Sequence, residues 1–272
     1  MKAERRSECD AGAMSPSRFV ALPMSPWSER ARFALDHHGI DYREDAYVPL
    51  LGELALRVRT GVYRGRLSVP VLFHEGHVIR DSVEIARYVD RLGKGTPLFP
   101  AGAEAEIARY VELTNTLMEA GRVLGVPRMA QSAEARNESL PSFMPAPLRS
   151  ALSPLAGMGM AYIARKYGLS EQAPQEARDT MRRILEQLRA GLKGRSTLLS
   201  DFTFADITTA VAMGAVRPVE HPALPLGPGM RAAFTEPLLV EEFGDLLAWR
   251  DRLYAERRPT RGSPRPAVTA AG

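Results

Sequence analysis

The segment from Phe19 to Arg30 constrains the fold of this chain more than any other part of the sequence. It begins with an apolar run that is typical of a buried strand. Ser25 and Pro26 follow, and this pair is typical of a helix start, because serine caps helices and proline suits the first helical position. The segment therefore predicts a strand at 18–23 that passes through a tight turn into a helix at 28–38.

The pattern of short elements continues to residue 92 and then changes. The next elements expected are a strand at 41–47, a helix at 50–60, a hairpin built from 69–73 and 78–79, and a helix at 82–92, which give the order βαβαββα. Residues 93–102 are rich in glycine and proline and predict a linker. We therefore expect an α/β domain at 18–92.

Everything after the linker has helical periodicity, so residues 103–257 are expected to form an all-helical domain. The expected helices are 103–124, 153–168, 171–193, 203–216 and 238–257. Thr203 and Asp206 have the spacing of a capping box, which predicts a sharp helix start there. The proline-rich stretches at 141–154 and 217–230 separate the helices. The chain of 272 residues is long enough for two domains, each with its own core.

The formal charge of +4 is confined to one end of the sequence. Residues 1–17 carry equal numbers of acidic and basic side chains, and residues 18–256 are neutral by subtraction. The excess charge comes from Arg257, Arg258, Arg261 and Arg265. We expect a disordered leader at 1–17 and a disordered basic tail at 258–272, which leaves open a weak contact of the tail with an acidic partner. A neutral folded surface argues against nucleic acid as a partner.

The single cysteine, Cys9, lies in the polar leader, so disulfides within the chain and a cysteine zinc cluster are excluded. His74 and His77 flank a turn without a third ligand nearby in sequence, so no metal is expected. The longest apolar stretch, 151–164, is too short to cross a bilayer and contains Pro154. We expect a cytoplasmic protein with no membrane association.

The two serines of the first turn suggest chemistry with a thiol. Ser25 and Ser28 stand where a thioredoxin-type turn, which this one resembles, carries two cysteines at a helix N-terminus that stabilises a thiolate. A hydroxyl cannot form a disulfide, but it can donate a hydrogen bond to the thiolate of another molecule. The simpler alternative is that Ser25 only caps the helix.

Two further pairs point to a small peptide ligand. Pro70 opens a strand, and a cis Val69–Pro70 bond would turn the Val69 backbone towards an extended ligand; the sequence does not decide the isomer. Asp81 and Ser82 stand at a helix start that could hold a carboxylate and an ammonium group, although Ser82 could simply cap the helix. Together with the serine turn, these pairs describe a glutathione site.

Residues 18–257 resemble a cytosolic glutathione transferase of the serine type. The resemblance is carried by the segments 25–28 (Ser-Pro-Trp-Ser), 68–72 (Ser-Val-Pro-Val-Leu), 80–90 (Arg-Asp-Ser-Val-Glu-Ile-Ala-Arg-Tyr-Val-Asp), 98–100 and 203–207. It implies a thioredoxin-like N-terminal domain, an all-helical C-terminal domain, glutathione as co-substrate without a metal, and a homodimer.

The resemblance also implies roles for single residues. Ser25 would activate the glutathione thiol, Val69 would pair with the cysteinyl backbone, and Asp81 with Ser82 would hold the γ-glutamyl end. The other glutathione-binding residues expected are Trp27, Ser28, Pro70 and Arg66. Arg66 is expected because Ser68 replaces the lysine that usually holds the glycyl carboxylate. Similar proteins more often carry glutamate or glutamine at the position of Asp81, and the shorter aspartate side chain reaches less far towards the γ-glutamyl end.

The second substrate would meet the helical domain. Tyr110, Thr114 and Met118 share a face of the helix 103–124 and are expected in its pocket, with interdomain core as the alternative. Residues 128–168 are interpreted as an insertion, whose helix carries Met158, Met160 and Tyr162 and would roof the pocket or form plain core.

The function expected is transfer of glutathione to a small apolar electrophile, as in detoxification. Two alternatives remain open. One is a non-catalytic binding or scaffold protein with the same fold. The other is a glutathione-dependent isomerase, dehalogenase or peroxide reductase, because the fold alone does not choose the reaction.

Overall fold

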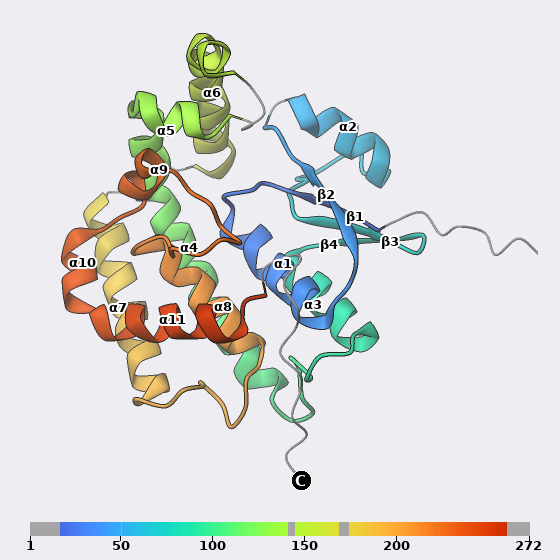
Figure 1. Cartoon of the computed structure of the whole chain (residues 1–272), viewed down its shortest axis with the longest axis vertical. Coiled ribbons are helices and arrows are strands. Elements are labelled where there is room, and N and C mark those ends of the chain that lie inside the picture. Colours follow the sequence, from blue (N-terminus) through green and yellow to red (C-terminus); the bar gives the residue numbers. More distant parts are fainter. Residues whose placement is uncertain (1–16, 50, 141–144, 169–173, 260–272) are drawn as a thin grey trace, which may run out of the picture.

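The computed structural model describes residues 17–49, 51–140, 145–168 and 174–259. The expected leader, apart from Ser17, and residues 260–272 of the expected tail lie outside this range. A small sheet with flanking helices forms one half of the molecule, and a larger group of helices forms the other, with α1 between them (Figure 1). The alternation of strands and helices up to residue 92 follows the order expected from the sequence.

The sheet contains the strands β1 (Ser17–Ala21), β2 (Tyr42–Ala46), β3 (Val71–His74) and β4 (His77–Arg80) in the spatial order β2-β1-β3-β4. β1 and β2 are parallel, whereas β3 is antiparallel to both β1 and β4. Side chains alternate between the faces, as a period of two requires. Phe19 and Leu72 belong to the large core of the molecule, while Val20 and Val71 form a smaller cluster with Leu56.

Helices cover both faces of this sheet. α1 (Pro26–His38) and α3 (Ser82–Leu92) pack against one another, and α2 (Leu51–Thr60) supplies Leu56 to the smaller cluster. Gly39 ends α1 with a φ of 67°, a left-handed conformation that glycine adopts without steric cost, directly after the end predicted for the helix 28–38. α1 also contacts α8 (Phe204–Ala212), so the helix that follows Ser25 joins the sheet to the helical half.

The helical half is centred on α4 (Glu104–Gln131), which packs against α6, α7 and α8. The other helical elements are α5 (Ala133–Glu138), α6 (Ala146–Tyr167), α7 (Pro174–Leu192), α8 (Phe204–Ala212) with the short η1 (Met213–Ala215), α9 (Pro228–Ala233), α10 (Pro237–Glu242) and α11 (Gly244–Arg257). Asp206 accepts a hydrogen bond from the Thr203 backbone N–H at 2.8 Å, so the expected capping contact is present at the start of α8.

α4 is longer than the sequence predicts, because it continues through Pro127. A proline inside a helix removes a backbone hydrogen bond and costs about 3 kcal/mol. Val126 and Met129 are buried on either side of it, and burial of such side chains contributes roughly 1.5–3 kcal/mol each. Packing therefore offsets the cost of the proline.

Other boundaries also differ from the predictions. α6 begins seven residues before 153, at Ala146, and the expected helix 238–257 is divided into α10 and α11 at Phe243. Phe243 is fully buried and has a φ of −118°, so its backbone leaves the helical region while its side chain anchors the bend. α5 and α9 were not expected. In the described part of the chain, no helix is both long and apolar enough to cross a membrane.

The expectation of a disordered tail from residue 258 onwards is wrong for Arg258 itself. Arg258 is only 4% exposed and forms ion pairs with Glu29 and Asp36 of α1. The run of basic residues concealed this, because an arginine in a polar segment is usually solvated. Two buried carboxylates, distant in sequence, provide its partners.

Candidate active site

A cavity of about 320 Å³ lies between the sheet and the helical half. From the first half it is lined by the turn before α1, the Val69–Pro70 segment and the start of α3. From the second half it is lined by one face of α4, by α6, by η1, and by the chain between Pro218 and Phe234. Most of the lining side chains are apolar. The sheet side contributes the polar groups of Ser25, Ser68, Asp81 and Ser82, and α4 contributes the charged side chains of Glu119 and Arg122.

Ser25 is the N-cap residue of α1, but its side chain makes no capping hydrogen bond. Its backbone N–H donates to the Leu22 carbonyl at 3.0 Å, and its carbonyl accepts from the Glu29 N–H at 2.9 Å, so the backbone of the turn is fixed. The side chain is half-buried and lines the cavity. The hydroxyl thus lies at the positive end of the helix dipole without being used to cap the helix.

Ser28 differs from Ser25, although both are in the same turn. Its side chain is fully buried, and its hydroxyl accepts a hydrogen bond from the Leu22 backbone N–H at 3.2 Å. Ser28 is absent from the cavity wall. The structure therefore does not bring Ser28 to the cavity wall, because its hydroxyl lies against the backbone of Leu22, and its contact with glutathione stays a prediction.

Trp27, which is predicted to bind glutathione, is half-buried on the cavity wall. The guanidinium carbon of Arg122 lies 4.1 Å from the centre of its ring, which is cation–π geometry. Arg122 also lines the cavity and was not identified from the sequence. Its position four residues after Met118, on the same helical face, was the signal that could have found it.

The Val69–Pro70 peptide bond is cis, the isomer that the sequence left open. Val69 is half-buried, Pro70 is buried, and both line the cavity that contains Ser25. Pro70 immediately precedes β3, so the sheet fixes the position of the Val69 backbone relative to the cavity.

Asp81, not Ser82, is the N-cap of α3. Its Oδ1 accepts hydrogen bonds from the backbone N–H groups of Val83 at 2.7 Å and Glu84 at 3.4 Å. Its φ is 78°, a strained conformation for a residue with a side chain, which costs roughly 1–3 kcal/mol and is often found at functional sites. The simpler alternative left open by the sequence, that Ser82 caps this helix, is therefore wrong.

Ser82 is buried at the edge of the cavity beside the side chain of Arg30. Arg30 Nε donates to Ser82 Oγ at 2.7 Å, and its Nη1 donates to Asn115 and Thr208 at 2.9 and 3.3 Å. Burial lowers the pKa of Arg30 to about 10, although Asp81 acts in the opposite direction. Because Ser82 Oγ accepts from Arg30, its own hydrogen is left to be donated to another group.

Arg66 does not lie on this cavity. It lines an adjoining depression of about 490 Å³ together with Arg80 and Arg91, and the two hollows share Ser68 and Asp81. Arg66 is exposed. Its role towards a glycyl carboxylate stays a prediction.

Of the three residues expected in the second-substrate pocket, the structure places only Met118 on the cavity. Tyr110 is buried against Gly191 of α7. The Thr114 hydroxyl lies 2.8 Å from that of Thr208 on α8. These two residues form core between helices of the helical half, whereas the alternative considered from the sequence was core between the two domains. The cavity face of α4 lies further along the helix, at Met118, Arg122, Val126 and Met129.

The region 128–168 reaches the cavity through α6. Tyr162 and Ile163 line it, and the Tyr162 hydroxyl donates a hydrogen bond to Glu53 of α2. Met158 is 59% exposed, and Met160 is buried in the core. The methionines named from the sequence therefore do not roof the cavity. Across the described ranges, no group of three or more His, Cys, Asp or Glu side chains is placed to hold a metal ion.

Comparison with known proteins identifies the first half of the molecule. Residues 24–92 match the family model for the glutathione S-transferase N-terminal domain. The chain carries a glutathione S-transferase N-terminal domain. Glutathione S-transferase U3 of Arabidopsis thaliana is 33% identical over 78 residues, which cover 28% of this chain and 33% of that protein. The match thus spans about a third of the length of this curated relative.

Solved structures extend the likeness to the whole fold. A glutathione S-transferase of Ceriporiopsis subvermispora, in complex with glutathione, aligns with a TM-score of 0.63 and 17% identity over 92% of this chain and all of that one. The β-etherase LigF of Sphingobium sp. strain SYK-6 aligns with a TM-score of 0.55 and 19% identity, covering 89% and 96%. The expected thioredoxin-like domain followed by an all-helical domain is confirmed.

Proposed function

We propose that this protein is a glutathione transferase in which Ser25 activates the glutathione thiol. The observation that carries the proposal is the Ser25 side chain, which stands at the N-cap of α1, faces the cavity and makes no capping hydrogen bond. A hydroxyl in this position can donate to a thiolate, while the first turn of α1 contributes free N–H groups and a positive dipole end.

The size of the effect can be approximated. A hydrogen bond to a charged group contributes about 1.5–3 kcal/mol and a helix terminus about 0.3–1 kcal/mol, whereas one unit of pKa corresponds to about 1.4 kcal/mol. Together they lower the pKa of the bound thiol by about 1 to 3, which leaves much of it ionised near neutral pH. The released proton passes to solvent. The thiolate then attacks an electrophilic carbon, a carbon–sulfur bond forms, and a leaving group takes the displaced electron pair.

Glutathione is proposed to lie along the sheet side of the cavity. The Val69 backbone would pair with its cysteinyl backbone, and Ser82 would donate its hydrogen to the γ-glutamyl carboxylate at the start of α3. The buried guanidinium of Arg30, 2.7 Å from Ser82 Oγ, adds a positive charge behind that carboxylate. Asp81 stands beside it to accept from the ammonium group, and Arg66 is retained for the glycyl carboxylate.

The electrophile would occupy the apolar side of the cavity. Met118, Tyr162 and the residues of η1 provide walls with few fixed polar groups, which suits a small apolar compound and gives loose selectivity. Gly214 of η1 widens this wall, because a Cβ added there would meet no heavy atom within 4 Å. Detoxification, a cytoplasmic location and a homodimer remain part of the proposal.

The test is the ultraviolet absorbance of the thiolate in glutathione bound to the purified protein, titrated with pH. We expect ionisation near neutral pH in the parent and a return towards the pKa of free glutathione in Ser25→Ala. Ser28→Ala is the matched control, because the Ser28 hydroxyl lies in the same turn but is buried against Leu22. An unchanged titration in Ser25→Ala would reject the assignment of Ser25.

A binding or scaffold protein with this fold is the second candidate. The observation in its favour is Ser68, because the resemblance calls for lysine there and Arg66 lies in the adjoining depression. This reading predicts glutathione affinity without turnover of any compound in a broad panel of electrophiles. Turnover that is lost in Ser25→Ala would reject it. The panel should include substrates for isomerisation, dehalogenation and peroxide reduction, which use the same thiolate.

A further inference from the structure

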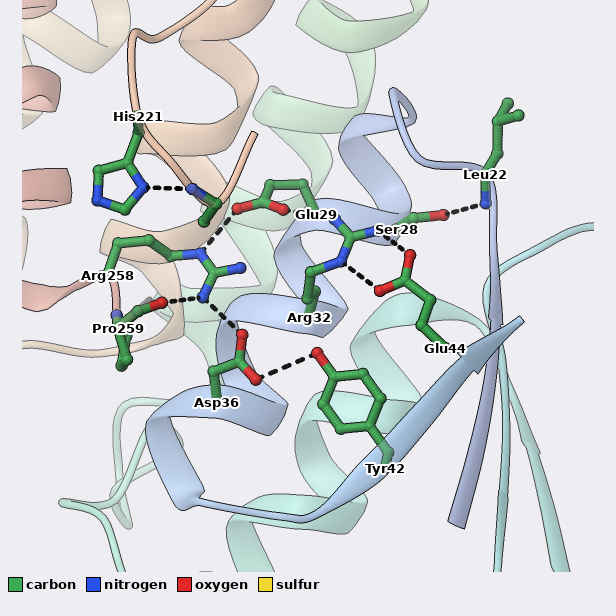
Figure 2. A network of polar contacts seen from close by, with 11 residues as sticks. Leu22, Ser28, Glu29, Arg32, Asp36, Tyr42, Glu44, His221, Arg258 and Pro259 are labelled. Atoms are coloured by element: carbon green, nitrogen blue, oxygen red, sulfur yellow. Dashed lines mark hydrogen bonds and ion pairs between the residues drawn. The ribbon is translucent and has the colours of Figure 1, made fainter. Parts of the chain in front are cut away.

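A buried network of charged side chains fastens the end of α11 to α1 (Figure 2). Its centre is Arg258, whose side chain is fully enclosed. Arg258 Nε donates to Glu29 Oε1 at 2.8 Å, and Nη1 donates to Asp36 Oδ2 at 2.7 Å. Glu29 and Asp36 are seven residues apart on one face of α1, so a single guanidinium spans two turns of that helix.

The same face of α1 is held from the sheet side. Arg32 lies between the two carboxylates and donates from Nη1 to Glu29 Oε2 at 2.6 Å. Its Nε and Nη2 donate to both carboxylate oxygens of Glu44 on β2, at 3.0 and 2.7 Å. The Tyr42 hydroxyl donates to Asp36 at 3.1 Å. Glu29 therefore forms ion pairs with one arginine from each half of the molecule, Arg32 and Arg258.

Glu29 connects this network to the active-site turn. It is in the first turn of α1, and its backbone N–H donates to the Ser25 carbonyl at 2.9 Å. Glu29 and Tyr254, a residue of α11 one turn before Arg258, are both among the residues that line the Ser25 cavity. A shift of the Glu29 side chain would thus be transmitted directly to the backbone that carries the Ser25 hydroxyl.

We propose that Arg258 is a positioning residue for the glutathione site: through Glu29 it fixes the first turn of α1, so that the Ser25 hydroxyl and the helix N-terminus point at the thiol. The inference rests on the proposed function of Ser25. It adds Arg258, a residue 229 positions from Glu29 in sequence that is not among the residues lining the Ser25 cavity.

The test compares Arg258→Met with the parent by two measurements on the full-length protein: glutathione affinity by calorimetry, and the pKa of the bound thiol by ultraviolet absorbance. Affinity should stay within about twofold, because Val69, Asp81 and Ser82 are held by other contacts. The pKa of the bound thiol should rise by about one, which is a tenfold lower ratio of thiolate to thiol at a given pH. Turnover at neutral pH should fall in parallel, with little change in KM for glutathione.

Arg257→Met is the matched control. It removes the same charge from the preceding residue, whose exposed guanidinium lies 5.4 Å from the centre of the Phe202 ring. The thiol pKa of this variant should equal that of the parent. An equal rise in both variants would show that net charge alone matters, and would overturn the proposal.

Two further variants separate positioning from electrostatics and from loss of folding. Glu29→Gln combined with Arg258→Met keeps the net charge of the network and leaves no unpaired Glu29. If Arg258 acts by positioning, the pKa of the glutathione thiol bound to the double variant stays raised. A pKa equal to that in the parent protein would overturn the proposal. Arg258→Lys keeps the charge, but an ammonium group lacks the forked donors with which the guanidinium reaches both Glu29 and Asp36. The pKa of the bound thiol is therefore expected to lie between those of the parent and Arg258→Met.

The proposal and the proposed function fail in distinguishable ways. A parent protein that binds no glutathione, or binds it without lowering the thiol pKa, overturns both. A parent with a lowered thiol pKa, together with an Arg258→Met variant that unfolds cooperatively and keeps the same thiol pKa, overturns only the role of Arg258. If Arg258→Met does not fold, the double variant and Arg258→Lys decide the question by the same criterion.

Discussion

Arg30 and Arg258 are both buried guanidinium groups that join α1 to the helical half, but their surroundings differ. The hydrogen bonds that the described residues give Arg30 go to the neutral side-chain oxygens of Ser82, Asn115 and Thr208. Arg258 instead contacts two carboxylates, those of Glu29 and Asp36. Burial lowers the pKa of Arg30 to about 10, whereas the two carboxylates outweigh burial and raise the pKa of Arg258.

The difference separates a charge that is neutralised within the chain from one that the proposed function assigns to a ligand. The charge of Arg258 is neutralised within the chain, so that side chain can hold α1 permanently. The charge of Arg30 is buried at a cost and is not matched by a carboxylate in hydrogen-bond contact among the described residues. An anionic group that binds beside Ser82, as proposed for the γ-glutamyl carboxylate, would offset the desolvation cost of the Arg30 charge.

The largest expected effect is on stability. Arg258→Met should lower the free energy of unfolding by about 3–5 kcal/mol, because it leaves buried carboxylates without their partner. Arg30→Met should change it by less than about 1 kcal/mol in the absence of ligand, because removing an uncompensated buried charge also removes its desolvation penalty. Urea unfolding of the two variants and the parent measures both values. Equal losses in the two variants would break the comparison.

A smaller effect is expected on glutathione affinity. Arg30→Met should raise the Kd for glutathione by about 10- to 150-fold, the equivalent of a hydrogen bond to a charged group worth about 1.5–3 kcal/mol. Titration calorimetry measures the change. The control is a glutathione analogue without the γ-glutamyl carboxylate. The parent and Arg30→Met should bind this analogue equally well, and a difference between them would mean that Arg30 serves another part of the ligand.

The smallest expected effect is on the pH dependence of stability. Burial alone would raise the pKa of Glu29, but Arg258 and Arg32 lower it overall. The stabilisation from this group is therefore fully present above its ordinary pKa of about 4.3, and is lost as the pH falls through the lower value in the folded state. Glu29→Gln should lose less stability than the parent between pH 6 and the most acidic pH at which both fold. Parallel curves in urea unfolding would contradict the ion pairs drawn in Figure 2.

The sequence predicted the parts of the molecule that depend on neighbours in the chain. Gly39 at the end of α1, the hairpin before Arg80, and the contact between Thr203 and Asp206 were all expected, because each is decided within a few residues. The division of the chain into an α/β half and a helical half was expected for the same reason. The strand-turn-helix segment at Ser25 was also recognisable, because its residue types are restricted by local geometry.

What the sequence did not predict depends on contacts between distant segments. The pocket face of α4 was placed too early along the helix, because periodicity identifies a buried face but not which neighbour covers it. Tyr110 and Thr114 are covered by α7 and α8, whereas Met118 meets the cavity. Arg258 was assigned to a tail for a similar reason, since nothing local shows that Glu29 and Asp36 are its partners.

The bond between Glu29 and Arg258 also has a consequence for the biosynthesis of the protein. A ribosome makes α1 early and Arg258 much later, 229 residues after Glu29. Until then, the two carboxylates on α1 lack one of the arginines that hold them in the finished molecule. A nascent chain, or one whose translation stops before Arg258, lacks the contact that is proposed to secure the turn at Ser25. Completion of the site therefore coincides with completion of α11.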